Sequence, residues 1–320
     1  MYKNSKLDIE KNEVFIPEKL KDKYKIIFGN SYDEFIESCK TRPKKAIRIN
    51  KIKCVDSSLV LEYLKSQNIE FTKFPILEET YLIESNVSAI GNTIEHLAGL
   101  FSIQEISSLI PAHVLDPKED DIVLDLTAAP GNKTIYLAQL MNNKGLIVAN
   151  DVDKDRIKTL IYNLKKQGVT NTIVTNKNGI NFNFNCKFNK ILLDAPCSCE
   201  GIIRRKNDIL KTWNENEVLG KAILQKKLII NAFNLLETSG QLVYSTCTIS
   251  PEENEEVIMH LLENEPSASI EKINLKLEGL SNGLTNYKNK NYNSSLKNAI
   301  RIFPHKTNLE AFFICKIKKN

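Results

Sequence analysis

The chain has 320 residues, of which 42% are hydrophobic and 26% are charged, and its formal net charge is +5. This composition is typical of a globular protein, and no window approaches the roughly 20 apolar residues that a membrane-spanning helix needs. The N-terminal stretch MYKNSKLDIEKNEV has no apolar core, which argues against a secretory signal, and the odd count of seven cysteines indicates free thiols in a reducing cytoplasm.

Positive charge is concentrated in the first 53 residues, which carry 14 Lys or Arg against 8 Asp or Glu. The excess is greatest in KTRPKKAIRINKIK (40–53), which has seven basic residues and no acid. Such a segment is either a solvated lysine-rich face or a surface for nucleic-acid phosphates, and charge alone does not decide between them. The following stretch, SSLVLEYLKSQNI (57–69), predicts a helix with a serine cap. We expect a small α/β unit here that ends near residues 90–105.

From residue 121 the pattern becomes regular. Apolar strands are predicted at 121–126, 145–151, 172–176, 190–195 and 241–246, with helices at 133–141 and 153–168 and a long helix that stops at 239–240. This alternation predicts a doubly wound, mostly parallel, Rossmann-like sheet, in which ligands bind beyond the carboxyl ends of the strands. Cys197 and Cys247 each follow a predicted strand, so we expect both thiols in one cleft.

The segment LDLTAAPGNKT (124–134) joins the first of these strands to its helix. Its small residues let a ligand approach the backbone, and the helix that follows offers free N–H groups. Asp151 stands 26 residues after Asp125, at the end of the second strand, where an acid accepts hydrogen bonds from ribose hydroxyls. No Walker-type GxxxxGK[ST] is present. The pattern therefore favours an adenosyl group without phosphates over ATP, the alternative being a turn that binds no ligand.

Cys247 is followed by TISPEENEEV, in which Ser250 and Glu253 have capping-box spacing. This spacing predicts that the thiol's loop is anchored directly before a helix. A free thiol has a pKa near 8.5, so a nucleophilic cysteine needs positive charge nearby. Lys133, in the first turn, is placed to supply it.

Three segments together carry a specific resemblance: DLTAAPGNKT (125–134), LLDAPCSCEGIIRR (192–205) and LVYSTCTISPEENEEVI (242–258). They resemble the RNA cytosine-C5 methyltransferases of the RsmB/Sun type. AIRINKIK, GLFSIQEISSLIPAHVL and RIFPHKTNLEAFFICKIKK extend the resemblance over roughly residues 40–320. It implies an N-terminal RNA-binding region at 1–100, containing a smaller α/β (RRM-like) domain. It also implies an S-adenosylmethionine-dependent catalytic domain at 101–320.

The resemblance also implies roles for individual residues. Cys247 would add to carbon 6 of cytosine and so make carbon 5 nucleophilic, whereas Cys197 would assist release of the product. Asp194 would contact the base edge near N3, and Lys133 would hold the base and the thiolate charge. S-adenosylmethionine is expected at Ala128, Ala129, Pro130, Gly131, Asn132, Lys133, Asp151, Arg156, Asn178 and Asp194. RNA is expected at Arg42, Lys44, Lys45, Arg48, Arg204 and Arg205, the last two being either phosphate contacts or supports of their loop.

Four positions depart from the family's pattern: Thr127 replaces a cysteine, Asn132 a glycine, Asn178 an acid and Cys199 a glycine. We expect Thr127 to be neutral and Asn132 to tolerate the turn, because asparagine adopts unusual φ and can cap a helix. The amide oxygen of Asn178 can still accept from adenine. Nothing in the sequence explains Cys199.

The predicted function is thus formation of 5-methylcytosine in RNA, with tRNA favoured over ribosomal RNA, by a monomer. One alternative is a DNA-type cytosine methyltransferase with Cys197 as the nucleophile. Another is a catalytically silent RNA-binding or ribosome-assembly factor. A metal site at Cys197, Cys199 and Cys247 is a third, but a single CxC lacks the paired CxxC spacing of structural zinc, so no metal is expected.

Overall fold

The computed structural model describes residues 14–85 and 90–320. Most of the N-terminal stretch inspected for a secretory signal lies outside the described residues. A nine-stranded sheet forms the body of the molecule, with the order β11-β14-β15-β9-β8-β5-β6-β7, and β10 pairs with β15. The parallel strands are β5 (Ile122–Asp125), β6 (Leu146–Asn150), β7 (Thr172–Thr175), β8 (Phe188–Asp194) and β9 (Leu236–Thr246). The doubly wound, mostly parallel sheet predicted from the sequence is confirmed, and its strand order reverses between β5 and β8.

The remaining strands of this sheet extend it beyond β9, and each pairs antiparallel with its neighbours. They are β10 (Ala268–Glu271), β11 (Ser281–Asn282), β14 (Ile300–Ile302) and β15 (Phe312–Lys319). A separate small hairpin joins β12 (Asn286–Tyr287) to β13 (Lys290–Asn291).

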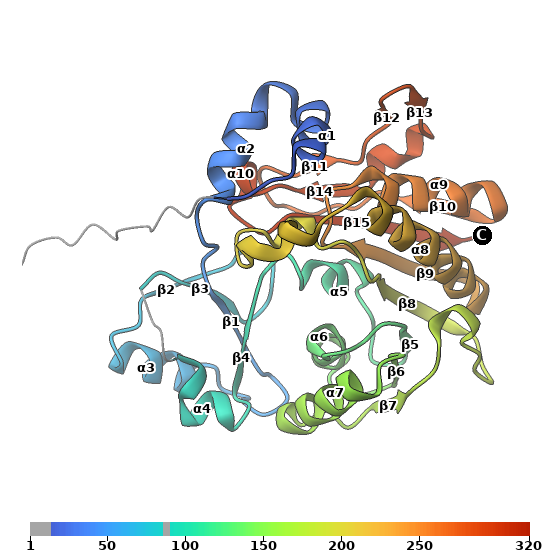
Figure 1. Ribbon diagram of the computed structural model, residues 1–320. Coiled ribbons are helices and arrows are strands. Elements are labelled where there is room, and N and C mark those ends of the chain that lie inside the picture. Colours follow the sequence, from blue (N-terminus) through green and yellow to red (C-terminus); the bar gives the residue numbers. More distant parts are fainter. Residues whose placement is uncertain (1–13, 86–89) are drawn as a thin grey trace, which may run out of the picture.

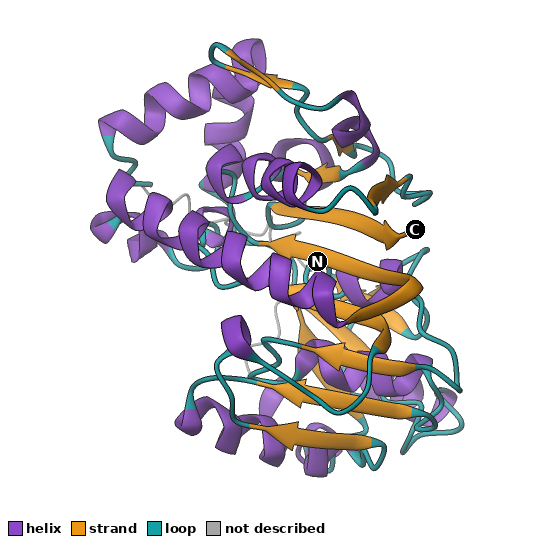
Figure 2. Ribbon diagram, turned by 90° about the vertical axis from the view of Figure 1, so that its right-hand side faces the viewer, coloured by secondary structure: helices purple, strands orange, loops and turns teal. Residues whose placement is uncertain are grey.

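Helices cover both faces of the large sheet (Figure 2). Because side chains alternate along a strand, Val123 and Leu192 pack on one face with α5 (Ile110–Leu115) and α6 (Asn132–Leu140). Leu124 and Leu193 pack on the other face with α8 (Glu215–Leu235) and α9 (Glu255–Asn264). The helix α7 (Lys154–Gln167) packs on the α6 side. The continuous apolar strands are therefore buried on both faces of the sheet, as the sequence pattern predicted.

The small N-terminal sheet has the order β2-β3-β1-β4 and is antiparallel throughout. Its strands are β1 (Ala46–Ile49), β2 (Phe71–Lys73), β3 (Thr80–Ile83) and β4 (Phe101–Gln104), with α3 (Ser58–Ser66) and α4 (Ile94–Leu97) between them. This order along the chain, β-α-β-β-α-β, is the split βαβ arrangement expected of an RRM-like unit. Since β4 pairs with β1, the unit extends to residue 104, beyond the boundary of 100 read from the sequence.

The first two helices, α1 (Glu18–Phe28) and α2 (Tyr32–Cys39), do not join this small sheet. They lie beside α10 (Pro304–Thr307), on the opposite side of the molecule from α3 and α4 (Figure 1). Tyr24 and Phe35 bury their rings in a cluster that includes Trp213 and Phe303. The described part of the N-terminal hundred residues therefore does not form one lobe, because α1 and α2 pack against the catalytic body.

Two predicted helix ends differ from the structure. Ser57 occupies the N-cap position of α3, but its side chain makes no capping bond within the described chain, and Asp56 Oδ1 accepts from the Ser58 N–H at 2.9 Å instead. The long helix α8 ends at Leu235 and not at residues 239–240, because Leu236 already pairs with Phe188 in β8. The helix α7 is capped as predicted, by the Asp153 carboxylate at its start and by Gly168, at φ 74°, at its end.

Buried polar side chains fix the small sheet on the catalytic body. The Asn50 amide donates to the carbonyls of Gly99 (2.8 Å) and Gln167 (2.9 Å). Arg48, expected to contact RNA, is only 1% exposed, and its guanidinium stacks 4.9 Å from the centre of the Tyr136 ring in α6. Burial lowers the pKa of Arg48 to about 10. The expectation of an RNA contact is wrong for Arg48, because its side chain is enclosed between the sheet and the helix.

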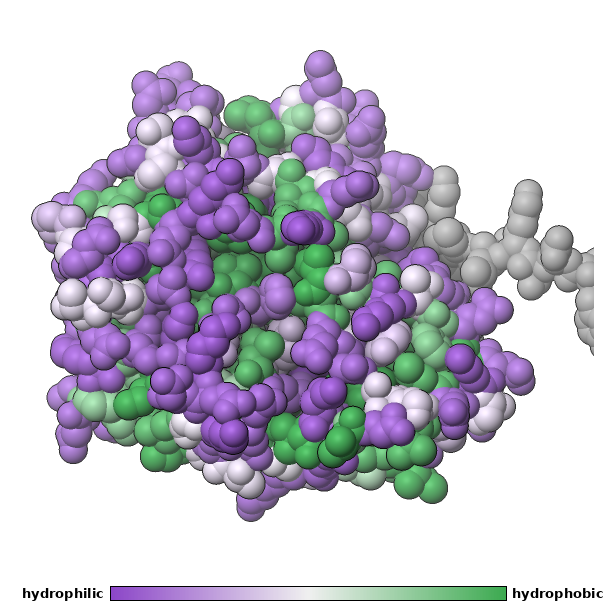
Figure 3. All heavy atoms as spheres, turned by 180° about the vertical axis from the view of Figure 1, so that it is seen from behind, coloured by the Kyte–Doolittle hydropathy of each residue, from purple (hydrophilic) through white to green (hydrophobic). Residues whose placement is uncertain are grey.

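Seen from behind, the surface is largely hydrophilic, with hydrophobic residues visible between the polar ones (Figure 3). Within the described ranges, no helix is both long and apolar enough to cross a membrane.

Candidate active site

The two predicted thiols meet at the carboxyl ends of neighbouring strands. The strands β8 and β9 are parallel and register Asp194 opposite Ser245, so the loops that follow them begin side by side. The Sγ atoms of Cys197 and Cys247 lie 3.4 Å apart. The expectation that the two thiols come together is confirmed.

The loop after β8, which carries Cys197, and the loop after β9, which carries Cys247, are the two thiol loops. A buried carboxylate from each loop accepts hydrogen bonds from the other loop. Glu253, from the Cys247 loop, accepts from the Ser198 N–H at 3.0 Å and from the Ser198 hydroxyl. Glu200, from the Cys197 loop, accepts from the Ser250 hydroxyl at 2.6 Å and from the Trp213 indole at 2.8 Å. The backbone adds a bond from Gly201 N–H to the Cys247 carbonyl at 2.8 Å.

The capping box expected at Ser250 and Glu253 is therefore wrong. Ser250 stands at an N-cap position, but neither side chain caps the short helix there, because both bond to the other thiol loop. The sequence analysis missed Glu200 and this role of Glu253. A signal for Glu200 was a charged residue within the stretch APCSCEGII (195–203), which is otherwise apolar or small, whereas Glu253 lies among three other glutamates and has no such signal.

Glu253 gives this junction a pH dependence. Burial raises its pKa from 4.5 to about 7, so its contribution to stability is present below about pH 4.5 and lost as the pH rises through 7. In wild type, the free energy of unfolding should fall between pH 4.5 and 7.5 as Glu253 ionises. In Glu253→Gln, we expect this fall to be smaller than in wild type by about 1–3 kcal/mol. Urea unfolding at several pH values measures this. The exposed Glu263→Gln on α9 is the matched control, and parallel curves for wild type and Glu253→Gln would contradict the prediction.

Lys133 and Asp194 form an ion pair beside the thiols. Lys133 Nζ lies 2.6 Å from Asp194 Oδ2, and the Ser245 hydroxyl donates to Asp194 Oδ1 at 2.7 Å. Burial lowers the pKa of Lys133, but Asp194 offsets this and leaves the pKa above its ordinary value. Thr127, which replaces the family's cysteine, donates to the Asp194 carbonyl at 2.8 Å. A charged lysine is thus held at the edge of the thiol cleft, where it also acts electrostatically on Cys247.

Cys199 brings a third thiol to the cleft, with its Sγ 3.9 Å from that of Cys197. Hydrogen bonds to Cys199 and Cys247, together with burial, raise the pKa of Cys197 well above its ordinary value. For Cys247 the bond from Cys197 lowers the pKa, but Cys199 and burial raise it by more. Two negative charges at such short distances repel strongly, so the cluster favours one thiolate and two thiols.

A cavity of about 580 Å³ opens between the first parallel strand, the start of α6 and the small sheet. Its lining includes Asp125, Thr127, Ala128, Ala129, Pro130, Asn132, Lys133, Arg156 and Asp194, as well as Gln104 and Ser108 from the other side. Asp125 Oδ2 accepts from Thr134 at 2.7 Å, whereas the buried Oδ1 has no partner among the described residues. Asp125, which lines the cavity, therefore has an acceptor oxygen that no described residue uses.

The turn that lines this cavity depends on Gly131, whose φ of 107° favours glycine. The turn tolerates Asn132 as expected, but Asn132 is the first residue of α6 and follows the turn, so it needs neither an unusual φ nor a capping bond. Asp151 Oδ2 accepts from the Ala129 N–H at 3.1 Å and lies 3.4 Å from Arg156. The acid predicted at the end of the second strand thus stabilises the turn.

Asn178, which the resemblance places at the cofactor, follows the third parallel strand, β7. It is exposed, it is not among the described residues that line the cavity, and its amide oxygen accepts from the Ile180 N–H at 3.0 Å. The oxygen retains a second lone pair, and contact with adenine stays a prediction.

Basic side chains line a second hollow, of about 580 Å³, that continues from the first. Arg42, Arg205, Lys206, Asp208 and Ile209 surround it, and Arg205 and Lys206 also line the cavity at the turn. A positively charged path therefore leads along the protein surface towards the site.

The other basic residues predicted to bind RNA differ in their surroundings. Arg204 is 2% exposed and donates to the carbonyls of Thr41 and Asn308, both at 2.9 Å, so it supports its loop. Lys44 is exposed and pairs with Glu84. Lys45 is exposed as well, and an RNA contact there stays a prediction.

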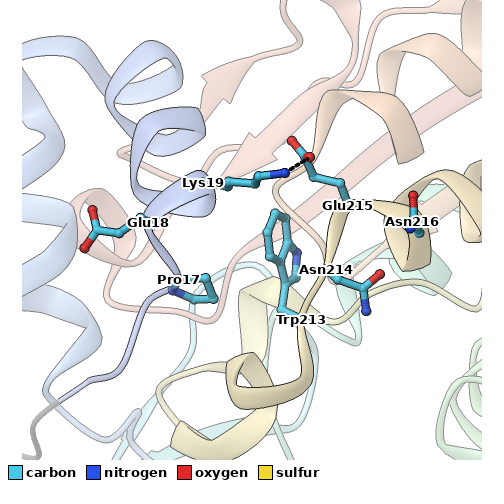
Figure 4. Close-up of a pocket in the computed structure, with 7 residues that line it drawn as sticks. All are labelled: Pro17, Glu18, Lys19, Trp213, Asn214, Glu215 and Asn216. Carbon is cyan, nitrogen blue, oxygen red and sulfur yellow. Dashed lines mark hydrogen bonds and ion pairs between the residues drawn. The ribbon is translucent and has the colours of Figure 1, made fainter.

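A smaller hollow, of about 330 Å³, lies between the start of α1 and the start of α8 (Figure 4). Lys19 and Glu215 form a 3.0 Å ion pair across it, beside the Trp213 ring. No thiol or turn residue is among the described residues that line it, so it is separate from the candidate site.

Comparison with known proteins identifies the same family as the three motif segments do. The family described as 16S rRNA methyltransferase RsmB/F matches residues 112–318, and the N-terminal domain of 16S rRNA methyltransferase RsmF matches residues 16–106. The chain is 40% identical over 278 residues to a tRNA (cytosine(49)-C(5))-methyltransferase of Pyrococcus abyssi, covering 86% of this chain and 88% of that protein.

It is also 37% identical over 318 residues to the ribosomal RNA small subunit methyltransferase F of Vibrio vulnificus. This match covers 96% of the chain but only 65% of the relative, so the chain spans about two thirds of that protein's length.

Two solved structures share the whole architecture. A methyltransferase homolog protein from Pyrococcus horikoshii superposes with a TM-score of 0.83 at 34% identity, over 93% of this chain and 94% of that one. NSun6 from Pyrococcus horikoshii, solved with SFG, superposes with a TM-score of 0.82, over 95% and 98% of the two chains. The second is 23% identical and supports the fold alone.

Proposed function

Because the chain belongs to the RsmB/F family of S-adenosylmethionine-dependent RNA (cytosine-C5) methyltransferases, we propose that it methylates cytosine in tRNA through a covalent Cys247 adduct. The observation that carries the proposal is the 3.4 Å approach of Cys197 to Cys247 beside the Lys133–Asp194 pair. Nucleophilic addition and elimination require a nucleophile with groups nearby that can give and take protons. In this proposal Cys247 is the nucleophile, and Cys197, Lys133 and Asp194 are those groups.

The residues of the cavity fit S-adenosylmethionine. The volume suits a ligand of this size, and the unpartnered Asp125 Oδ1 can accept from its ammonium group. Ala128, Pro130 and Lys133 border the space in which its adenosyl and methionyl parts would lie. When bound, the cofactor supplies an electrophilic methyl group on a sulfonium sulfur.

The protein's own contribution begins at Cys247. In the proposed first step its thiolate forms an Sγ–C6 bond with cytosine, and the electron pair of the C5=C6 double bond moves towards C5 and N3. Asp194 contacts the base edge. Lys133, whose Nζ lies 2.6 Å from Asp194 Oδ2, supplies the proton that N3 gains. Carbon 5 then has the electron density to accept the methyl group. The positive charge of Lys133 also favours the thiolate form of Cys247.

Release of the product reverses the addition. Carbon 5 loses its proton, the C5=C6 double bond forms again, the C6–Sγ bond breaks to return the thiolate, and N3 gives its proton back to Lys133. Cys197 is the group 3.4 Å from the Cys247 sulfur, and we assign the uptake of the C5 proton to its thiolate form, whose own proton has first passed to solvent. The carboxylates that join the two loops keep this short distance fixed.

The choice of tRNA is supported by the Pyrococcus abyssi relative, nearly all of which corresponds to this chain. RNA reaches the site, in this proposal, along the hollow lined by Arg42, Arg205 and Lys206, whose charges displace counterions from phosphate. The seven cysteines are all unpaired, which suits a reducing cytoplasm as the place of action.

Ribosomal RNA is the second candidate, since the matching family and the Vibrio relative are both described as acting on it. Labelled methyl transfer into separate pools of unmodified tRNA and 16S ribosomal RNA distinguishes the two. We expect 5-methylcytosine in tRNA at a rate at least about tenfold above that in 16S RNA. A reaction without cofactor is the control. Label in 16S RNA alone would favour the second candidate, and label in neither pool would contradict the proposal.

A further inference from the structure

The three thiols of the cleft lie at the spacing of ligands around a single metal ion. The Sγ of Cys197 is 3.4 Å from that of Cys247 and 3.9 Å from that of Cys199, and all three sulfurs lie within 4.8 Å of one another. Around a tetrahedral ion with metal–sulfur bonds of about 2.3 Å, sulfurs are ~3.8 Å apart. The observed spacing needs only small movements to match this.

Cys199 occupies its place at an energetic cost, which points to a use for its side chain. Its φ of 59° lies in the left-handed region, where a residue with a Cβ is less stable than glycine by roughly 1–2 kcal/mol. The resemblance expects glycine at this position, and the two-thiol chemistry described above does not use Cys199. The side chain nevertheless brings its sulfur within reach of both other thiols.

We propose that Cys197, Cys199 and Cys247 form a binding site for a thiophilic d10 cation such as Zn²⁺ or Cd²⁺, and that its occupancy blocks the nucleophile. As three sulfur–metal bonds form, the two thiols lose their protons to solvent and the third sulfur binds as the thiolate that it already is. This inference goes beyond the proposed function and does not depend on which RNA is methylated.

The surroundings suit such a complex. Three thiolates and a divalent ion carry a net charge of −1, and Lys206 and Lys221 both act electrostatically on Cys199, as Lys133 does on Cys247. Cys199 and Cys247 are only partly buried, so an ion can reach them, and three protein ligands leave the fourth position of a tetrahedral ion open. A site with three protein ligands and one open position can exchange its metal, unlike a structural site in which four protein ligands enclose the ion.

The test is a Cd²⁺ titration of the full chain, kept reduced with a phosphine and free of other thiols, followed by the ultraviolet thiolate-to-cadmium charge-transfer absorption. Wild type is expected to bind one ion per chain. Cys199→Gly, which restores the family's residue and relieves the left-handed strain, is expected to bind at least about 100-fold more weakly, beyond the usual effect of outer ligands. Zn²⁺ should displace Cd²⁺ from wild type at the same stoichiometry.

The matched control is Cys186→Ala, which removes a partly buried thiol outside the cluster and should bind as wild type does. Far-ultraviolet circular dichroism and thermal unfolding of Cys199→Gly should match those of wild type, which shows that the variant is folded. Equal Cd²⁺ affinity of wild type and Cys199→Gly would overturn the proposal, and so would the absence of a charge-transfer band from wild type. Neither result bears on the methylation proposal, because the titration contains no RNA.

Discussion

Replacing Cys247 with alanine is expected to slow methyl transfer by at least about 10,000-fold, the scale seen when a catalytic nucleophile is removed. Without the Sγ–C6 bond, carbon 5 of cytosine lacks the electron density to accept a methyl group. Cofactor binding should not change, because Cys247 is not among the described residues that line the cavity at the turn. Single-turnover transfer of labelled methyl, with calorimetry of S-adenosylmethionine binding alongside, measures both effects.

Cys186→Ala provides the control for this experiment, since Cys186 is also a partly buried free cysteine but lies outside the cleft. It should transfer methyl as wild type does. An active Cys247→Ala together with an inactive Cys197→Ala would support the DNA-type alternative, in which the Pro-Cys thiol attacks, and would end the assignment of Cys247.

Cys197→Ala is expected to have a different effect, the accumulation of enzyme joined covalently to RNA. Addition through Cys247 remains possible in this variant, but the group assigned to take the C5 proton is missing. Elimination should therefore slow by about 100-fold or more, within the range of general acid–base catalysis. Denaturing gel electrophoresis with labelled RNA reveals the adduct as a protein band that carries RNA.

The double variant Cys197→Ala, Cys247→Ala is the control, because it should form no adduct if the bond is made by Cys247. The same adduct in the double variant would show that another group attacks the base. A Cys197→Ala enzyme that turns over at the wild-type rate without adduct would contradict the role assigned to Cys197 in release.

The geometry behind both results depends on the junction between the two loops. Glu200 and Glu253 are each buried and each accept from the opposite loop, so the thiols stay close together without a disulfide. Loss of a carboxylate at this junction should disturb both thiols together. Cys197 and Cys247 are therefore expected to respond as a unit to changes in the loops that carry them.

Much of this arrangement could be predicted from local sequence. The five parallel strands follow from apolar runs of strand length, and the ends of α7 follow from an acidic cap and a terminal glycine, because these signals act through neighbouring residues. The placement of Cys197 and Cys247 in one cleft follows from the rule that parallel strands present their carboxyl ends on one edge.

Other features were decided by contacts between distant residues. A basic run of sequence cannot reveal that Arg48 stacks on Tyr136 and that Arg204 bonds to Thr41, because burial depends on how the domains pack. The spacing of Ser250 and Glu253 fits a local cap, but stronger buried partners on the other thiol loop compete for both side chains.

The sequence by itself thus determined the five parallel strands, the turn before α6 and the meeting of Cys197 and Cys247, since each depends on short-range pattern and strand polarity. Only the tertiary structure decided which basic residues remain exposed to RNA, which carboxylates join the loops, and that Cys199 completes a cluster of three sulfurs. These outcomes depend on desolvation and on distances between segments far apart in the chain, which no local pattern encodes.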